Sequence, residues 1–161
     1  MNITGIRTKV IGMAERVHSM VGLVKNGFME NSLEPLASAM KEEAVINEDE
    51  KALTQNILEL SRTCGDKAQQ AALAVLEGAV EMLERMGDEA ASLIERIEIK
   101  VSERLLFSDM GVQQFNETYD AMHKSVEMML GFLRDPKPAL RDRIIDNGFH
   151  VKALVERYIA D

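Results

Sequence analysis

The chain has 161 residues, of which 46% are apolar but only 4% aromatic, a composition that favours packed helices over a sheet protein. Its net charge of −8 argues against nucleic acid as a partner, because nucleic-acid binding needs a basic surface. The single cysteine excludes an intrachain disulfide and fits a cytosolic location. We expect neither a signal peptide nor a membrane-spanning segment.

The first 62 residues predict two helices. Apolar residues recur every three or four positions in the first helix, at Ile6, Val10, Met13, Val17, Met20, Val24 and Phe28. Ser32 is the expected N-cap of a second helix over residues 33–62. The inward seam expected for this helix is polar in its middle, reading Leu36, Met40, Glu43, Asn47, Glu50, Thr54 and Ile57. Alternatively the seam drifts, and the three polar residues in its middle lie at a solvated edge.

A third helix is expected over residues 67–105. Its apolar face comprises Leu73, Leu76, Val80, Leu83, Ala90, Ile94, Ile97 and Val101. Glu84 and Asp88 share a different face, where they are exposed and repel each other because they lie four residues apart. Glu77 and Glu81 extend that face, on which we expect no Lys or Arg. Such a face favours a cation or a basic partner, and an ordinary solvated surface is the alternative.

Two further helices complete the pattern. The stretch Phe107-Ser108-Asp109 is expected to end the third helix and cap the fourth, whose apolar positions are Val112, Phe115, Tyr119, Met122, Val126, Met129 and Leu133. Prolines end it, and the fifth begins near Pro138. The sequence contains a weak internal repeat, in which a shift of 103 residues aligns Pro35 with Pro138. The fourth and fifth helices then correspond to the first and second, and no helix corresponds to the third. We therefore predict an all-α antiparallel bundle of five helices, and expect the missing helix to belong to a longer chain or a partner.

Two motifs carry a resemblance to a known family. The third helix contains Leu83-Glu84-Arg85-Met86-Gly87-Asp88, and the second contains Glu43-Ala44-Val45-Ile46-Asn47-Glu48-Asp49-Glu50. With these motifs and this helix order, the chain resembles the PhoU proteins and the PhoU-like domains of sodium–phosphate cotransporters. The resemblance implies a complete three-helix repeat over residues 1–106. A partial second repeat over residues 107–161 would pack with it as one unit.

The resemblance also implies a function. Family members are not established enzymes; they regulate phosphate transport and phosphate signalling through contact with a transporter or sensor at the cytosolic side of the membrane. Their acidic motifs bind divalent or ferric metal, with iron or zinc among the metals. Carried over by motif, the metal residues are Glu43, Asn47 and Glu50 on the second helix and Glu84 and Asp88 on the third. Asp146 and His150 form a half-site that departs from the family pattern, because His replaces the usual acid or Asn.

Other functions remain open. The chain could be the regulatory domain of a sodium–phosphate cotransporter, or a metal-free helical adaptor with a docking surface rich in Met. A buried di-iron enzyme is disfavoured, because its Glu-x-x-His pairs must face the bundle core. Here Glu15 and His18 lie off the apolar face, so His18 is expected in solvent and His123 at the core edge. We expect the last two helices to cover the third helix or a second copy, a homodimer being favoured.

Overall fold

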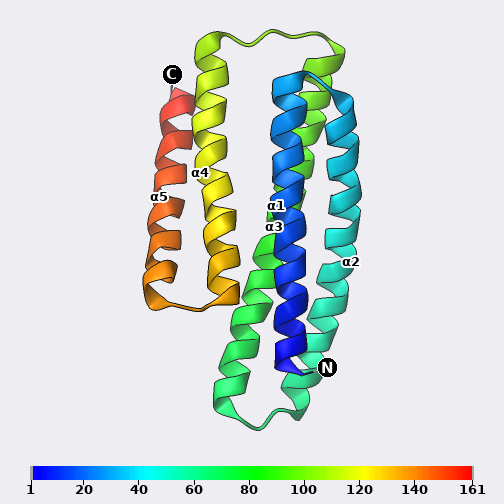
Figure 1. Cartoon of the computed structure of the whole chain (residues 1–161), viewed down its shortest axis with the longest axis vertical. Coiled ribbons are helices and arrows are strands. Elements are labelled where there is room, and N and C mark those ends of the chain that lie inside the picture. Colours follow the sequence, from blue (N-terminus) through cyan, green and yellow to red (C-terminus); the bar gives the residue numbers. More distant parts are fainter. Residues whose placement is uncertain (1, 161) are drawn as a thin grey trace.

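The structure is a computed structural model that describes residues 2–160, with side chains to residue 158, and these residues form helices and no strand. The helices are α1 (Ile3–Glu30), α2 (Leu33–Thr63), α3 (Lys67–Ser102), α4 (Asp109–Arg134) and α5 (Pro138–Ala160). Figure 1 shows α1, α2 and α3 as one long bundle and α4 with α5 as a shorter hairpin beside it. The predicted all-α fold is confirmed.

Polar side chains define where the helices begin. Ser32 Oγ accepts a hydrogen bond from the Glu34 backbone N–H (3.4 Å), and Ser108 Oγ accepts one from the Gly111 N–H (3.1 Å). The predicted cap Ser32 is therefore confirmed, and within the predicted capping stretch 107–109 the capping residue is Ser108. Asp66 caps α3 in the same way, through the backbone N–H groups of Ala68 and Gln69.

The core of the three-helix bundle follows the spacing predicted for α1 and α3, but not the one predicted for α2. All seven expected apolar residues of α1 are buried. In α2 the buried residues are Leu36, Ala39, Ile46, Leu53 and Ile57. Met40 and Thr54, expected in the seam, are exposed. The seam has drifted because Ile46 and Leu53 offer apolar surface to the core where Asn47 and Thr54 do not.

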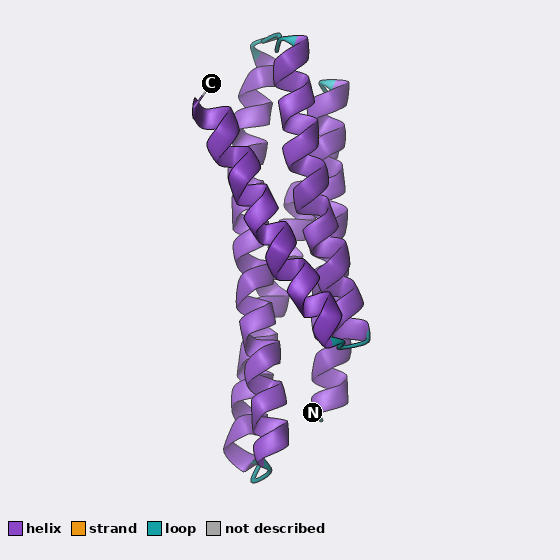
Figure 2. Cartoon of the chain, turned by 90° about the vertical axis from the view of Figure 1, so that its left-hand side faces the viewer, coloured by secondary structure: helices purple, strands orange, loops and turns teal. Residues whose placement is uncertain are grey.

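The α4–α5 hairpin packs on α1, so its expected placement on α3 is wrong. Within the described residues α4 contacts α1 and α5, whereas α3 contacts only α1 and α2. The α1–α4 contacts run antiparallel: Phe28 stacks on Phe115 with ring centroids 3.8 Å apart, and Tyr119 donates to the Val21 carbonyl oxygen (2.7 Å). At the other end Arg134 pairs with Glu15. α1 is therefore buried from two sides, and α5, which crosses in front of the molecule in Figure 2, packs only on α4.

A buried lysine ties α3 to the end of α1. Lys100 Nζ donates to the Phe28 carbonyl oxygen (3.2 Å) and to Asn31 Oδ1, and it lies 4.6 Å from the centroid of the Phe28 ring. Its positive charge sits where the carbonyls of α1 lack helical partners, which stabilises that helix end.

None of the helices within residues 2–160 combines the length and the apolar character that crossing a membrane requires.

Candidate functional site

The acidic residues predicted from the motifs come from two neighbouring helices. We call Glu43, Asn47 and Glu50 of α2, with Glu84 and Asp88 of α3, the acidic cluster. Asp88 is exposed as expected, but Glu84 is half-buried, as are the three residues of α2. The three α2 residues lie beside the line of residues that α2 buries in the core. The alternative prediction, in which they lie at a solvated edge, therefore describes them better than the prediction of a polar core position.

Charge repulsion operates inside the acidic cluster. Partial burial raises the pKa of Glu84, and the negative charges of Asp88 and Glu50 raise it further, with Arg85 opposing them. A hydrogen bond with Asp88 acts in the same direction as burial. Because Glu50 belongs to α2 and Glu84 to α3, the cluster brings carboxylates together across the helix pair. Such a group of oxygens suits a hard cation.

Some members of the cluster already have partners. Asn47 Nδ2 donates to Glu43 Oε1 (2.6 Å), and the Thr54 hydroxyl donates to Glu50 Oε1 (3.1 Å). Among the described residues, no three carboxylates of the cluster place an oxygen atom within 4.8 Å of one another. The chemistry of the donors therefore fits a metal, and binding would require their side chains to turn toward a common point.

The predicted acidic face of α3 also involves Gly87, which packs against α2, and Arg85, which pairs with one of its acids. Gly87 is buried against Ile46, and a Cβ added there would lie 3.4 Å from Ile46 Cγ2, an ordinary contact. Arg85 Nη2 lies 4.0 Å from Glu81 Oε1, so the expectation that no basic residue shares this face is wrong. Helical spacing of four residues explains that pair. No ion pair within the described residues involves Glu84 or Asp88, although the charge of Arg85 acts on Glu84.

The residues of the second half-site lie elsewhere. Asp146 and His150 are exposed on α5, which packs only on α4, so they are not part of the acidic cluster. No third His, Cys, Asp or Glu of the described chain forms a compact group with them.

A histidine group at the α1–α4 interface was missed by sequence reasoning. His18, His123 and Glu127 form the one group of three described residues whose possible ligand atoms all lie within 4.8 Å of one another. His18 was expected in solvent, but its Nε2 atom is shielded from it. Burial lowers the pKa of His123, as does His18, while Glu127 opposes the shift. The spacing of His123 and Glu127 was a readable signal, but the partner on α1 was not.

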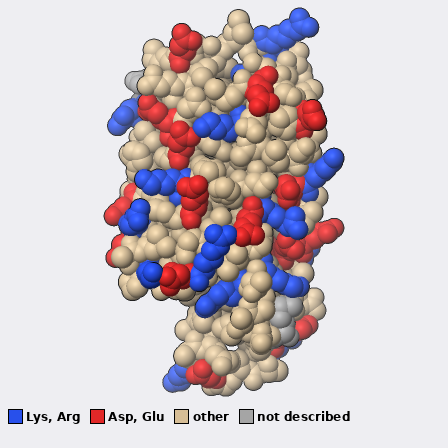
Figure 3. Space-filling view, viewed as in Figure 1, with Lys and Arg blue, Asp and Glu red and all other residues tan. Residues whose placement is uncertain are grey.

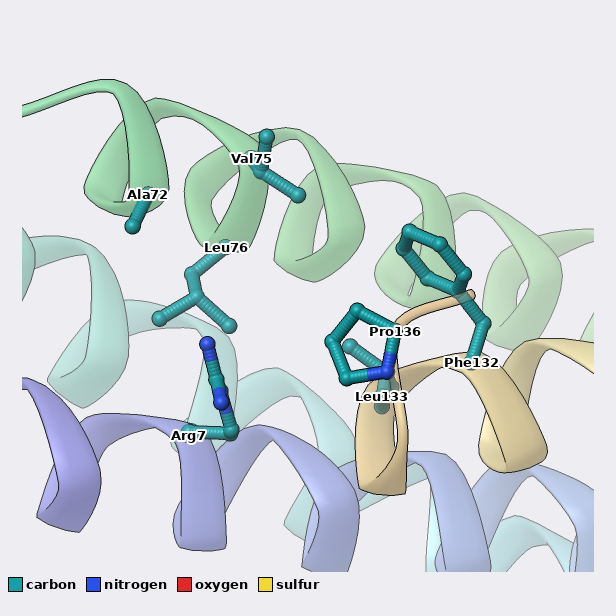
Figure 4. A pocket seen from close by; sticks show the side chains of 7 residues that line it. All are labelled: Arg7, Ala72, Val75, Leu76, Phe132, Leu133 and Pro136. Atoms are coloured by element: carbon teal, nitrogen blue, oxygen red, sulfur yellow. The ribbon is translucent and has the colours of Figure 1, made fainter. Parts of the chain in front are cut away.

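Two other surfaces carry less chemistry. A shallow apolar pocket is lined by Arg7 of α1, three residues of α3 and the end of α4 with its following turn, and Figure 4 shows these side chains, which are Arg7, Ala72, Val75, Leu76, Phe132, Leu133 and Pro136. Arg7 is its one charged lining residue. Figure 3 shows acidic and basic side chains interspersed over the face seen in Figure 1, so this face has no single-sign patch.

Comparison with known proteins agrees with the geometry. Residues 10–97, more than half of the chain, match a family model described as the PhoU domain. The match covers most of α1, all of α2 and α3 as far as Ile97, and therefore both halves of the acidic cluster. Neither the curated proteins nor the solved structures gave a significant match.

Proposed function

The chain belongs to the PhoU family, and from this premise we propose that it regulates phosphate transport by contact with a membrane transporter or sensor, and that its acidic cluster binds metal. The family is a regulatory, non-enzymatic one associated with phosphate transport. The proposed regulator works in the cytoplasm, at the membrane through its partner. The match over residues 10–97 is the observation that carries the proposal.

Electrostatics support the metal part of the proposal. The negative charges of Asp88 and Glu50 add to the cost of ionising Glu84, and a cation among the three carboxylates would offset that cost. A like-charged pair four residues apart on a helix destabilises it by about 0.2–0.5 kcal/mol. A divalent or ferric ion, iron or zinc in particular, would replace this repulsion with attraction and link α2 to α3. Glu43 and Asn47 would complete its surroundings.

Thermal unfolding tests the acidic cluster. A ligand that binds only the folded state raises the melting temperature. We expect Mn²⁺, Zn²⁺ and Fe³⁺ (supplied as citrate) to raise it for the wild-type chain. Glu84→Ala with Asp88→Ala should reduce the rise, most clearly for Mn²⁺ and Fe³⁺, which prefer oxygen ligands. Without metal, the double variant should be as stable as the wild type or slightly more so, because one repulsive pair is gone.

A matched control lies on the same helix. Glu77→Ala with Glu81→Ala also removes two exposed acids four residues apart, but outside the cluster. This variant should keep the metal response of the wild type. If the Glu84/Asp88 variant and the wild type respond equally to all three metals, the acidic cluster is not a metal site.

Phosphate uptake tests the regulatory part. Cells that lack the chain should differ from wild-type cells in phosphate uptake, and the wild-type chain should restore it better than the Glu84/Asp88 variant does. If phosphate uptake is unchanged both by loss of the chain and by the Glu84/Asp88 substitutions, the proposed regulatory role is wrong.

A metal-free helical adaptor is the second candidate function. Exposed methionines favour it, since Met side chains adapt to varied partners; they are Met29, Met40, Met82, Met110 and Met122. Normal phosphate regulation by the Glu84/Asp88 variant would select this adaptor. Finding this sequence within the polypeptide of a sodium–phosphate cotransporter would instead identify the chain as that protein's regulatory domain.

A further inference from the structure

The middle of the α1–α4 interface holds a compact group of metal-ligating atoms. His18 Nε2 lies 3.7 Å from Glu127 Oε1, and His123 Nδ1 lies 3.8 Å from the same oxygen. The two imidazole rings face each other with centroids 4.3 Å apart. Two helices thus direct three potential ligand atoms to one point, in contrast to the looser acidic cluster.

The contacts within the group do not satisfy its polar atoms. His18 Nε2 is shielded from solvent and has no hydrogen-bond partner among the described residues. The separations from Glu127 exceed those of a hydrogen bond, so neither histidine is held by one there. Buried polar atoms are normally paired, and an unpaired one calls for an explanation such as a bound ion.

We propose that His18, His123 and Glu127 form a metal site, separate from the acidic cluster, that binds a first-row transition ion, with zinc as the expected occupant. Imidazole nitrogens with one carboxylate oxygen are a common ligand set for zinc. In tetrahedral zinc sites neighbouring ligand atoms lie about 3.3–3.5 Å apart, as follows from bonds of about 2.0–2.2 Å. The observed 3.7 and 3.8 Å need to shorten by only a few tenths of an ångström.

The surroundings permit an ion at this position. Lys25 is the nearby cation, and its Nζ is paired with Asp120 Oδ1 at 2.7 Å, so a carboxylate offsets its charge. The Glu127 side chain is 57% exposed, which leaves a route for the ion and room for a water in the fourth position. The site is therefore open on one side, as three-ligand zinc sites are.

The position of the site gives it a mechanical consequence. His18 belongs to the three-helix bundle, whereas His123 and Glu127 belong to the hairpin. α5 packs only on α4, so the hairpin joins the rest of the described chain through α4 and the connection from α3. Zinc bound here would clamp the hairpin to the bundle.

Metal titration of the full chain tests the proposal. We expect one Zn²⁺ per chain at this site by calorimetry, and Co²⁺ in its place should show the visible absorption of a low-symmetry site with nitrogen ligands. His18→Ala with His123→Ala should weaken zinc binding by about 100-fold or more, since even the loss of an outer partner costs about 10- to 100-fold. Zinc should also slow amide exchange in α4 and α5 of the wild-type chain.

Three further variants make the result decisive. His150→Ala removes an exposed histidine of α5 and should leave zinc binding unchanged. Glu127→Gln keeps the side-chain shape at a largely exposed position, so it should fold normally and still lose at least about tenfold in affinity. If the double histidine variant does not fold, the zinc affinity of Glu127→Gln tests the proposed site instead. Glu84→Ala with Asp88→Ala should retain this zinc site.

The outcomes separate this site from the acidic cluster. Zinc binding that survives loss of His18, His123 or Glu127 but weakens without Glu84 and Asp88 overturns the histidine site and leaves the proposed function intact. The reverse pattern supports the histidine site alone. Equal losses in His150→Ala and in the His18/His123 variant would show surface binding only and overturn the proposal.

Discussion

At the scale of single residues, Gly27 of α1 packs tightly against the beginning of α2. A Cβ added to Gly27 would lie 2.3 Å from Leu36 Cδ2 and 3.2 Å from the Ser32 carbonyl oxygen. Leu36 is completely buried, so any shift of its side chain would disturb a packed core. The glycine is therefore required by packing between two helices, although it costs helix propensity.

Substitution of Gly27 should accordingly destabilise the bundle. We expect Gly27→Ala to lower the free energy of unfolding by about 1–3 kcal/mol, the usual cost of overpacking a core. Gly22→Ala on the same helix is the control, because its Cβ would meet nothing within 4 Å. It should raise stability by up to about 1 kcal/mol through helix propensity. Urea denaturation measures both, and equal effects of the two substitutions would contradict the packing argument.

Tyr119 should make the free energy of unfolding depend on pH in the alkaline range. Burial, and to a lesser extent the charge of Asp120, raises the pKa of its phenol to about 12, against about 10 in an unfolded chain. The folded state favours the neutral phenol, so this contribution is complete below about pH 10 and is lost as pH rises toward 12. Tyr119→Phe removes it, together with the hydrogen bond to the Val21 carbonyl oxygen.

The difference in the free energy of unfolding between wild type and Tyr119→Phe separates the effect of Tyr119 from that of other titrating residues. In urea denaturation near pH 8 the variant should be less stable by about 1 kcal/mol, the value of one hydrogen bond. The difference should shrink, and then reverse, between about pH 10 and 12. A difference that stays constant over this range would show that Tyr119 ionises normally in the folded protein.

At the scale of elements, the helices differ in how many neighbours bury them. Within the part of the chain that the structure describes, α1 contacts α2, α3 and α4, whereas α5 contacts only α4. Most side chains of α5 are exposed, and Leu154 is the one buried apolar residue described in it. Local stability follows the number of buried apolar contacts. The fifth helix should therefore open without the rest of the molecule.

Amide hydrogen exchange should reveal this order. We expect the backbone amides in the middle of α5 to exchange faster than those in the middle of α1, with α4 in between, in the absence of metal. Helix ends serve as an internal reference for fraying and are left out of the comparison. Equal protection of α1 and α5 would mean that a contact outside the described chain covers α5, and a second copy is the first partner to test.

At the scale of the whole molecule, apolar side chains remain on two outer faces. Ile145 and Phe149 of α5 lie four residues apart and are 45% and 68% exposed, and Val75 and Met82 of α3 are each 56% exposed. Apolar groups on unpaired helix faces mark sites of association. These residues support the expected homodimer, in which a symmetric contact would cover the same face on both copies.

Sedimentation velocity tests the homodimer. The wild-type chain should sediment as a dimer at micromolar concentration, and Ile145→Lys with Phe149→Lys should shift it to monomer. Leu58→Lys is the matched control, since Leu58 is also exposed, at 49%, but lies on α2. If the wild-type chain remains monomeric at all concentrations, the homodimer prediction is wrong. If the control variant shifts to monomer as much as the α5 variant does, the dimer contact does not lie on α5.

Local patterns were sufficient for the helices themselves. The spacing of apolar residues predicted five helices, and Ser32 and the stretch 107–109 predicted where two of them begin, because periodicity and capping depend on residues close in sequence. The proximity of Glu84 to Asp88 and of Glu43 to Asn47 follows from the same helical spacing. The function came from motifs that resemble the PhoU family, and the match over residues 10–97 bears out that family.

Only the tertiary structure decided which helix faces meet. α2 buries Ile46 in place of Asn47, α4 covers α1 and not α3, and Glu50 lies near Glu84 across two helices. His18 and His123 are 105 positions apart, so no local pattern could place them together. Amphipathic helices with more than one apolar edge can pack in several ways, and the arrangement is set by the total burial of all five.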